Sequence, residues 1–196
     1  MTDSLVVPEG MRSIEVPRIA TMFGSDSDLD QAVEAHEFLL QLADNGRVGL
    51  FDEWTNSIHR NPVDVLIRLS ILIGQVDAII VGAGWANQLT GCANAFLRNL
   101  FEDNHIVIFG VAIADPKNSI HTQAAILSIT ELPGSEVVFN NYVGAEGCLR
   151  AAKDAASGIY PIITLKEQKP AVRRSMKEAL EIGRKQREKM KGEAKP

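Results

Sequence analysis

Short apolar runs alternate along this chain with segments of helical periodicity, and this alternation limits the folds that the chain can adopt. The predicted strands are residues 19–23, 47–54, 78–81 and 106–113, with a short strand near 137–138. Helical patterns follow the first three strands, and further helices are expected at residues 119–129 and 145–156. Such alternation is typical of a parallel sheet covered by helices on both faces. We therefore predict a doubly wound, three-layer α/β fold, flavodoxin-like or Rossmann-like, with a C-terminal helix.

The first three helical segments carry apolar residues at the spacing of a single helix face. The expected buried faces are Leu29, Val33, His36, Leu40 and Ala43 after the first strand, Val63, Leu66, Ile67, Ser70 and Ile73 after the second, and Leu89, Ala93, Phe96, Leu97 and Leu100 after the third. Ser27 and Asn61 are expected to cap the first two helices, with Pro62 at the first helical position. Three polar motifs therefore lie where a strand gives way to a helix.

Composition restricts the class of protein. The 196 residues fit one domain, with 45% hydrophobic and 23% charged residues. No apolar run reaches bilayer length and no leader pattern begins the chain, so we expect a cytoplasmic protein without a membrane partner. Cys92 and Cys148 are far apart and lack a CxxC partner, which favours ordinary small apolar residues over a disulfide or a metal site.

The two ends of the chain differ from its centre. Residues 1–17 contain Pro8, Gly10 and Pro17 and are expected to be an N-terminal arm with little structure, before an α/β domain at 18–160. Residues 161–196 are predicted to be a basic helical extension, because residues 166–196 hold 11 Lys or Arg and 5 Glu. No aromatic residue interleaves these charges, so we expect a solvated helix that packs on its own or a neighbouring subunit, and no nucleic-acid partner.

The first polar motif, Gly24-Ser25-Asp26-Ser27-Asp28, follows the first predicted strand. Exposed amides and hydroxyls at a helix start form an anion site, and the Asp28 carboxylate could accept hydrogen bonds from ribose hydroxyls. The alternative is that Ser27 only caps the helix and Asp28 only complements its dipole. In an open parallel sheet all such turns lie on one edge, where ligands bind.

The second motif, residues 57–62, adds an imidazole and a guanidinium to the same edge. Arg60 offers a fixed charge and planar donors that suit phosphate, and His59 has a side chain that titrates near neutral pH. Ser57 begins the turn. His36, His105 and His121 lack such neighbours and are interpreted as structural. The set suits a phosphorylated sugar ligand with a proton-transfer group beside it.

The third motif, residues 82–91, is rich in glycine. Gly82 and Gly84 are expected to permit close approach of the backbone to a ligand. The motif matches the G-x-G-x-x-G pattern of dinucleotide-binding folds poorly. Asn87 stands where that pattern has its third glycine, and no acidic residue ends a following strand at the expected interval.

Together the motifs resemble the aminoimidazole ribonucleotide carboxylase/mutase family of purine biosynthesis, known as PurE. That family carries Gly-Ser-x-Ser-Asp, Ser-Ala-His-Arg-Thr-Pro and Ala-Gly-Ala-Gly-Gly-Ala-Ala-His-Leu-Pro-Gly in this order, and the corresponding segments here are 24–28, 57–62 and 81–91. The resemblance continues through 109–113 and 128–134 and covers roughly residues 18–157.

The resemblance implies a role for each matching residue. Ser25, Ser27 and Arg60 would hold the substrate phosphate, Asp28 would hold the ribose, and His59 would be the general acid/base at imidazole C4. Ser57, Gly84, Trp85, Ala86 and Gln88 would complete the substrate site. The implied reaction forms 4-carboxy-5-aminoimidazole ribonucleotide from N5-carboxyaminoimidazole ribonucleotide, or from aminoimidazole ribonucleotide and CO2, without metal or other cofactor. Family members form homo-octamers, so a homo-oligomer is also implied.

The third motif departs from the family pattern. Trp85 replaces a glycine, Gln88 replaces a histidine and Thr90 replaces a proline in the segment that surrounds the carboxyl group and the imidazole. Gln88 can form hydrogen bonds but carries no charge. Besides the family reaction, two alternatives therefore stay open. One is a relative that carboxylates or binds a different phosphoribosyl nucleotide, and the other is a non-catalytic binding subunit.

Overall fold

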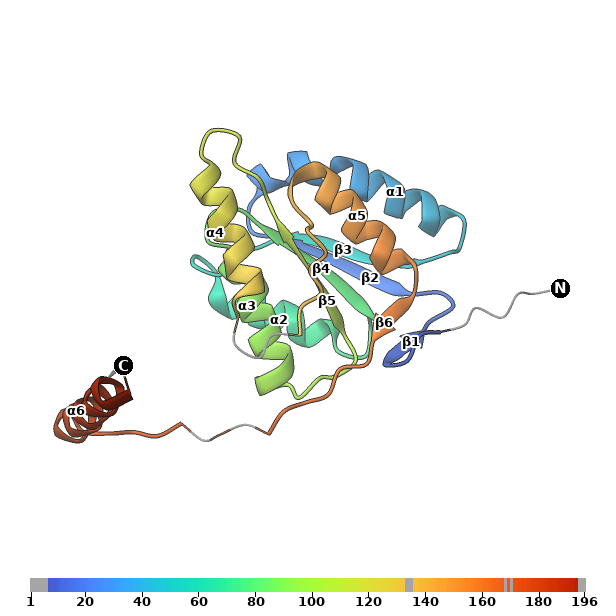
Figure 1. Ribbon diagram of the computed structural model, residues 1–196. Coiled ribbons are helices and arrows are strands. Elements are labelled where there is room, and N and C mark those ends of the chain that lie inside the picture. Colours follow the sequence, from blue (N-terminus) through green and yellow to red (C-terminus); the bar gives the residue numbers. More distant parts are fainter. Residues whose placement is uncertain (1–6, 133–135, 168, 170, 194–196) are drawn as a thin grey trace. The chain divides into compact units, whose positions relative to one another are not determined.

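The computed structural model describes residues 7–132, 136–167, 169 and 171–193 (Figure 1). The chain divides into two compact units, Met1–Leu165 and Lys166–Pro196. The second unit contains one helix, α6 (Met176–Glu193). Its start is a capping box, because the Ser175 Oγ accepts from the Glu178 N–H at 3.3 Å and a Glu178 carboxylate oxygen accepts from the Ser175 N–H at 2.7 Å.

A parallel sheet of four strands forms the centre of the first unit. Its strands are β2 (Arg18–Phe23), β3 (Gly49–Thr55), β4 (Ala78–Ala83) and β5 (Val107–Ala112), in the order β3-β2-β4-β5. Beyond β5, Val138 and Val143 make isolated parallel bridges to Phe109 and Ala112. This order is that of flavodoxin-like sheets, which confirms the predicted fold class. The strand expected near residues 137–138 is reduced to the single bridge at Val138.

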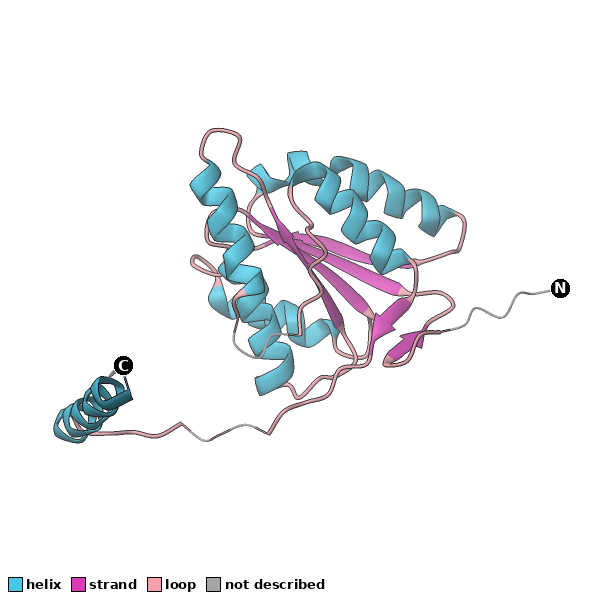
Figure 2. Cartoon of the chain, viewed as in Figure 1, coloured by secondary structure: helices cyan, strands magenta, loops and turns pink. Residues whose placement is uncertain are grey.

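Helices cover both faces of this sheet (Figure 2). The 3-10 helix η1 (Asp26–Ala32), α1 (Val33–Asp44) and α5 (Gly144–Ala156) pack on one face, where Ile19 and Phe23 of β2 point. On the other face α2 (Pro62–Leu72) and α3 (Gln88–Ala95), with the π-helical turn η2 (Phe96–Leu100), cover Ala20 and Met22. Helix α4 (Ser119–Thr130) packs Ala125 and Ile129 near Ala112.

The predicted faces of the first two helices are wrong in phase. In α1 the expected Val33 and Leu40 are about half exposed, and Ala35 and Leu39 are buried instead. In α2 the buried residues are Val65, Leu69 and Leu72, whereas the expected Val63 and Ile67 are exposed. Both helices carry apolar residues on more than one face, so periodicity alone offers two phases and packing on the sheet decides between them. The face expected after the third strand is confirmed at Leu89, Ala93 and Leu97 of α3 and η2, whereas the expected Leu100 is exposed.

Three local expectations also need correction. The segment expected to lack structure forms β1 (Met11–Ser13), which pairs antiparallel with β6 (Ile159–Pro161). These strands lie far apart in sequence, so no local pattern could reveal their pairing. The cap of the first helix is Ser25 rather than Ser27, because the chain enters through η1 before α1 begins. Asn61 stands at the N-cap of α2 but makes no capping hydrogen bond through its side chain.

Candidate functional site

A cavity of about 360 Å³ opens at the carboxyl ends of β2, β3 and β4. Strand-to-helix turns of a parallel sheet meet at this edge, which is where ligands bind in such folds. The cavity is lined by all ten residues that sequence analysis assigned to the site: Ser25, Ser27, Asp28, Ser57, His59, Arg60, Gly84, Trp85, Ala86 and Gln88. The structure thus brings them together, while the role of each remains a prediction.

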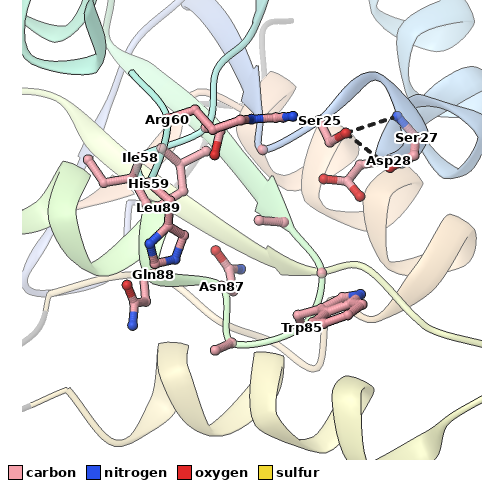
Figure 3. A pocket seen from close by; sticks show the side chains of 15 residues that line it. Ser25, Ser27, Asp28, Ile58, His59, Arg60, Trp85, Asn87, Gln88 and Leu89 are labelled. Atoms are coloured by element: carbon pink, nitrogen blue, oxygen red, sulfur yellow. Dashed lines mark hydrogen bonds between the residues drawn. The ribbon is translucent and has the colours of Figure 1, made fainter. Parts of the chain in front are cut away.

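The turn after β2 presents two hydroxyls to the cavity (Figure 3). The Ser25 Oγ accepts from the Ser27 Oγ at 3.0 Å and from the Ser27 N–H at 3.4 Å, which places both hydroxyls beside the start of η1. Gly24 is required by close packing, because a Cβ there would lie 2.9 Å from the Ala83 Cβ. The ends of β2 and β4 therefore approach closely, and the serines stand beside the third motif.

Asp28 lies between the serines and the third motif and is only partly exposed. Burial, reinforced by the negative charge of Asp30, raises the pKa of its carboxyl to about 6, although a backbone hydrogen bond from Ser25 opposes the shift. A carboxyl group with such a pKa is largely ionised at neutral pH and gains a proton in mild acid. It can accept hydrogen bonds from a sugar and also exchange a proton.

The turn after β3 carries the two basic groups. The Ser57 carbonyl accepts from the Arg60 N–H at 3.1 Å and from the Asn61 N–H at 2.8 Å, which fixes the turn before α2. His59 and Arg60 are exposed, and within the described part of the chain neither side chain has a hydrogen-bond or ion-pair partner. Figure 3 shows the Arg60 side chain extending toward Ser25, while the His59 ring lies near Asn87 and Gln88. Both groups are free to engage a ligand.

The turn after β4 has an unusual backbone. Trp85 has φ +55° and Asn87 has φ +23°, values that side-chain-bearing residues rarely adopt. Asn87 is buried and anchors the turn: its amide donates to the Val111 carbonyl at 2.9 Å, and its Oδ1 accepts from the Thr90 Oγ1 at 2.9 Å. Sequence analysis treated Asn87 only as a missing glycine. Its position before a helix was the signal for a cap.

Gly82 and Gly84 of this motif serve different purposes. A Cβ at Gly82 would lie 2.4 Å from the Phe23 ring, so this glycine makes room for a core aromatic residue. The expectation that Gly82 approaches a ligand is therefore wrong, because Gly82 does not line the cavity. Gly84 does line it, and a Cβ there would have only ordinary contacts, at 3.8 Å from the Asp28 carboxylate.

His121 borders the site, although sequence analysis interpreted it as structural. Its ring stacks on the Trp85 indole, with centroids 4.3 Å apart and an angle of 19° between the planes. The other two histidines assigned to structural roles pair with carboxylates away from the cavity, His36 with Glu53 and His105 with Asp77. His121 is 36 positions from Trp85, and no local pattern connects the two.

A second cavity, of about 370 Å³, adjoins the first and shares Ser27, Asp28, Gly84 and Trp85 with it. Asp30, Asp115 and Lys117 add charge to its lining. Across the described residues, no group of three or more His, Cys, Asp or Glu is placed to hold a metal ion. Nor does any helix in that part of the chain have the length and apolar character needed to cross a membrane.

No protein-family model matches the chain, and no curated protein matches its sequence. Among solved structures, the crystal structure of Treponema denticola PurE is similar over 92% of this chain and 99% of that chain, with 15% sequence identity and a TM-score of 0.49. At this identity and score, the likeness does not assign an activity to the chain.

Proposed function

We propose that the cavity binds a phosphoribosyl aminoimidazole and that the chain is a carboxylase or mutase of purine biosynthesis. The product would be 4-carboxy-5-aminoimidazole ribonucleotide. The observation that carries this proposal is the meeting of Ser25, Ser27, Arg60 and His59 in one cavity, on motifs that resemble those of the PurE family. No single motif would be sufficient, because serine caps and exposed histidines are common.

The phosphate of the ligand would bind between the two turns. Arg60 supplies charge-assisted hydrogen bonds, and Ser25 and Ser27 supply hydroxyls and backbone amides at the start of η1. Asp28 lies next along the chain, where its carboxylate would accept from the ribose hydroxyls. This order places the base toward His59 and the third motif.

His59 would exchange the proton at imidazole C4. When C4 attacks the carbon of CO2, the new C–C bond forms and C4 must lose its proton for the ring to regain aromaticity. The His59 imidazole accepts that proton. In the mutase reaction the N5–carboxyl bond breaks first, and the protonated His59 imidazole gives its proton to the amine nitrogen. The neutral imidazole then accepts the proton that C4 loses after it has attacked CO2, so no net proton is gained or lost. The gain of electron density at the CO2 carbon balances its loss at C4, so the reaction is redox-neutral overall and needs no redox cofactor.

The experiment that tests this proposal offers the two substrates separately to the purified full chain. Conversion of N5-carboxyaminoimidazole ribonucleotide without added bicarbonate supports a mutase, and conversion of aminoimidazole ribonucleotide with bicarbonate supports a direct carboxylase. The His59→Asn chain is the matched control. Binding of both compounds without turnover of either would overturn the enzymatic proposal and favour a binding subunit.

A second candidate is favoured by the third motif. Trp85 is 67% exposed at the cavity, in a segment where the family has a smaller residue, and Gln88 lacks the charge of the histidine it replaces. These changes favour a relative that acts on a different ring while retaining the phosphate and ribose positions. Turnover of other ribonucleotides, combined with inactivity on aminoimidazole ribonucleotides, would select this candidate.

We also propose that the chain forms a homo-oligomer, with an octamer as the state implied by the family resemblance. Large apolar side chains are exposed at Val33 and Leu40 of α1 and at Val63, Ile67 and Ile71 of α2. Exposed apolar patches of this kind mark contact surfaces. Light scattering at micromolar concentration tests the proposal, and a monomeric mass would contradict it.

A further inference from the structure

Trp85 combines an unfavourable backbone conformation with a largely exposed side chain. A φ of +55° is unfavourable for a bulky residue, and such conformations gather at functional sites where the surroundings enforce them. The indole gains little from burial, because 67% of Trp85 is exposed. The side chain borders both cavities, and in Figure 3 it lies below Asp28 at the edge of the first. An exposed aromatic residue with a positive φ at the edge of a cavity indicates a role in ligand binding.

One face of the indole is covered from behind. The His121 ring, from the first turns of α4, stacks on it nearly parallel, with centroids 4.3 Å apart. One face of the indole therefore contacts His121, and the exposed surface of the indole is its other face and its edges. An aromatic ring backed in this way offers a flat surface to a second flat ring.

The His121 ring is itself held at both nitrogens. Its Nδ1 lies 2.7 Å from the Asp115 carboxylate and its Nε2 lies 3.0 Å from the Asn118 side-chain nitrogen. The Asn118 Oδ1 accepts from the Ile120 N–H at 3.0 Å, which orients its amide group so that the nitrogen faces the imidazole. Nε2 is then the acceptor and Nδ1–H donates to Asp115. These contacts fix the ring, and through it the plane of the indole.

We propose that Trp85 is the platform on which the planar base of the ligand stacks, and that His121, held by Asp115 and Asn118, is its positioning residue. The proposal rests on the proposed function, because it assumes that a phosphoribosyl ligand occupies the first cavity. It adds that the ring of this ligand is recognised by stacking on the Trp85 indole. It also assigns selectivity for the ring of the ligand to Trp85 of the third motif and His121 of α4.

The first test separates the ring from the phosphate. Titration calorimetry on the full chain compares ribose 5-phosphate with two ribonucleotides, the one-ring 5-aminoimidazole ribonucleotide and the two-ring inosine 5′-monophosphate. Replacing a stacking aromatic residue weakens binding on the order of tenfold to a hundredfold. Trp85→Ala should lose this much for the preferred ribonucleotide and leave the affinity for ribose 5-phosphate unchanged, whereas Trp85→Phe should retain most of it.

Indole fluorescence provides a readout that a structural role would not move. The chain has two tryptophans, so emission is measured in the Trp54→Phe chain, in which Trp85 is the sole indole. Ligand affinities of this chain are compared with those of the parent as the matched control. The preferred ribonucleotide should quench this emission and ribose 5-phosphate should not. If neither class of ligand binds the parent chain, the proposed function fails and the platform fails with it. If both ribonucleotides bind no tighter than ribose 5-phosphate and quench nothing, the phosphate site stands and the platform is wrong.

The second test addresses His121. His121→Ala should lower the affinity for the preferred ribonucleotide severalfold and make the Trp85 emission less anisotropic. His121→Phe should restore both only in part, because it keeps a ring behind the indole but loses the contacts to Asp115 and Asn118. Parent-like ribonucleotide affinity in a folded His121→Ala chain would remove His121 from the site. If Trp85→Ala lowers the oligomer mass but leaves ribonucleotide affinity unchanged, the indole is a contact between chains and the platform is wrong.

Discussion

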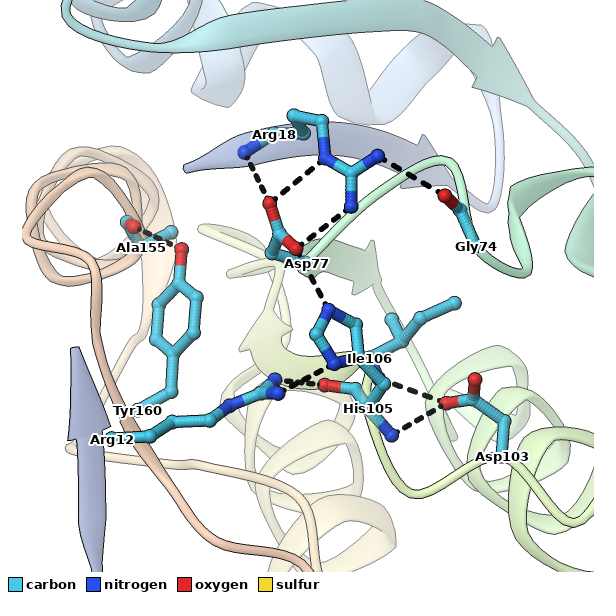
Figure 4. A network of polar contacts seen from close by, with 9 residues as sticks. All are labelled: Arg12, Arg18, Gly74, Asp77, Asp103, His105, Ile106, Ala155 and Tyr160. Atoms are coloured by element: carbon cyan, nitrogen blue, oxygen red, sulfur yellow. Dashed lines mark hydrogen bonds and ion pairs between the residues drawn. The ribbon is translucent and has the colours of Figure 1, made fainter. Parts of the chain in front are cut away.

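The amino edge of the sheet depends on one buried carboxylate, and replacing it tests how the strands are held together. Asp77 precedes β4 and is 3% exposed. Its Oδ2 accepts from the backbone N–H of Arg18 at 2.9 Å and from Arg18 Nε at 3.1 Å, and its Oδ1 lies 3.0 Å from Arg18 Nη2 and 2.8 Å from His105 Nε2 (Figure 4). His105 also contacts Arg12 of β1 through its ring and its carbonyl. Asp77 therefore links β2, β4 and the start of β5.

The size of the effect follows from the pKa of this carboxyl. Burial by itself would raise the pKa, but the hydrogen bonds from Arg18 and His105 outweigh it and lower the pKa from 3.8 to about 2. Such a shift corresponds to roughly 2.5 kcal/mol of stability. Because the folded-state pKa is the lower one, this stability is present above pH 4 and is lost as the pH falls toward 2. Asp77→Asn should thus lower the free energy of unfolding by roughly 2–3 kcal/mol at pH 7, and the melting temperature by roughly 5–10 °C.

Urea denaturation followed by circular dichroism, at several pH values between 7 and 2, measures the difference. The gap between parent and Asp77→Asn should be widest at neutral pH, fall to about half near pH 3 and nearly close at about pH 2. Glu34→Gln is the matched control, because it removes one exposed carboxylate from α1 and should change stability by less than about 0.5 kcal/mol. Equal stability of parent and Asp77→Asn at pH 7, or a gap that is constant with pH, would refute this reasoning.

Four further outcomes are expected. Arg60→Ala should weaken ribose 5-phosphate binding by roughly 1.5–3 kcal/mol, measured by calorimetry, because a charge-assisted hydrogen bond is lost; unchanged affinity would remove Arg60 from the phosphate site. His59→Asn should bind ligand normally but turn over at least about a hundredfold more slowly, and near-normal rates would exclude His59 as the acid/base group. As the pH falls below 6, the affinity of the parent for phosphoribosyl ligands should decrease more steeply than that of the Asp28→Asn chain. The reason is that the Asp28 carboxyl has a pKa of about 6, whereas the ligand phosphate titrates equally with both chains. Identical pH profiles of affinity would contradict the ribose role of Asp28. Gly82→Ala should destabilise the fold by roughly 1–3 kcal/mol in thermal melts, because its Cβ would meet the Phe23 ring at 2.4 Å, and a neutral effect would show that the core adapts.

The two edges of the sheet differ in what their polar residues do. At the amino edge the polar side chains hydrogen-bond to one another, as Asp77, Arg18 and His105 do. At the carboxyl edge His59 and Arg60 are exposed and lack partners within the described residues. Groups paired among themselves stabilise the fold, whereas exposed and unpaired groups at a cavity are available to a ligand. This contrast supports a site at the carboxyl edge independently of the motifs.

The class of fold, and the gathering of the candidate residues at one edge of the sheet, were predictable from the sequence. Alternating strand and helix patterns are local properties, and parallel connection of such units directs every strand-to-helix turn to one edge. The meeting of Ser25, Asp28, His59 and Gln88 follows from that rule, without knowledge of any distance. Strand positions were predictable for the same reason, since β4 and β5 are buried along their whole length and appear as unbroken apolar runs.

Which helix face is buried, and which distant residues lie beside the cavity, could be known only from the folded chain. The α1 and α2 segments are apolar on two sides, so the sequence permits both phases, and contact with the sheet selects Leu39 and Leu69 over Leu40 and Ile67. The pairing of β1 with β6 and the stacking of His121 on Trp85 join segments 36 or more residues apart. Periodicity describes a residue's neighbours along the chain. Contacts across such separations depend on how the packed elements fit together, and that information is present only in the folded molecule.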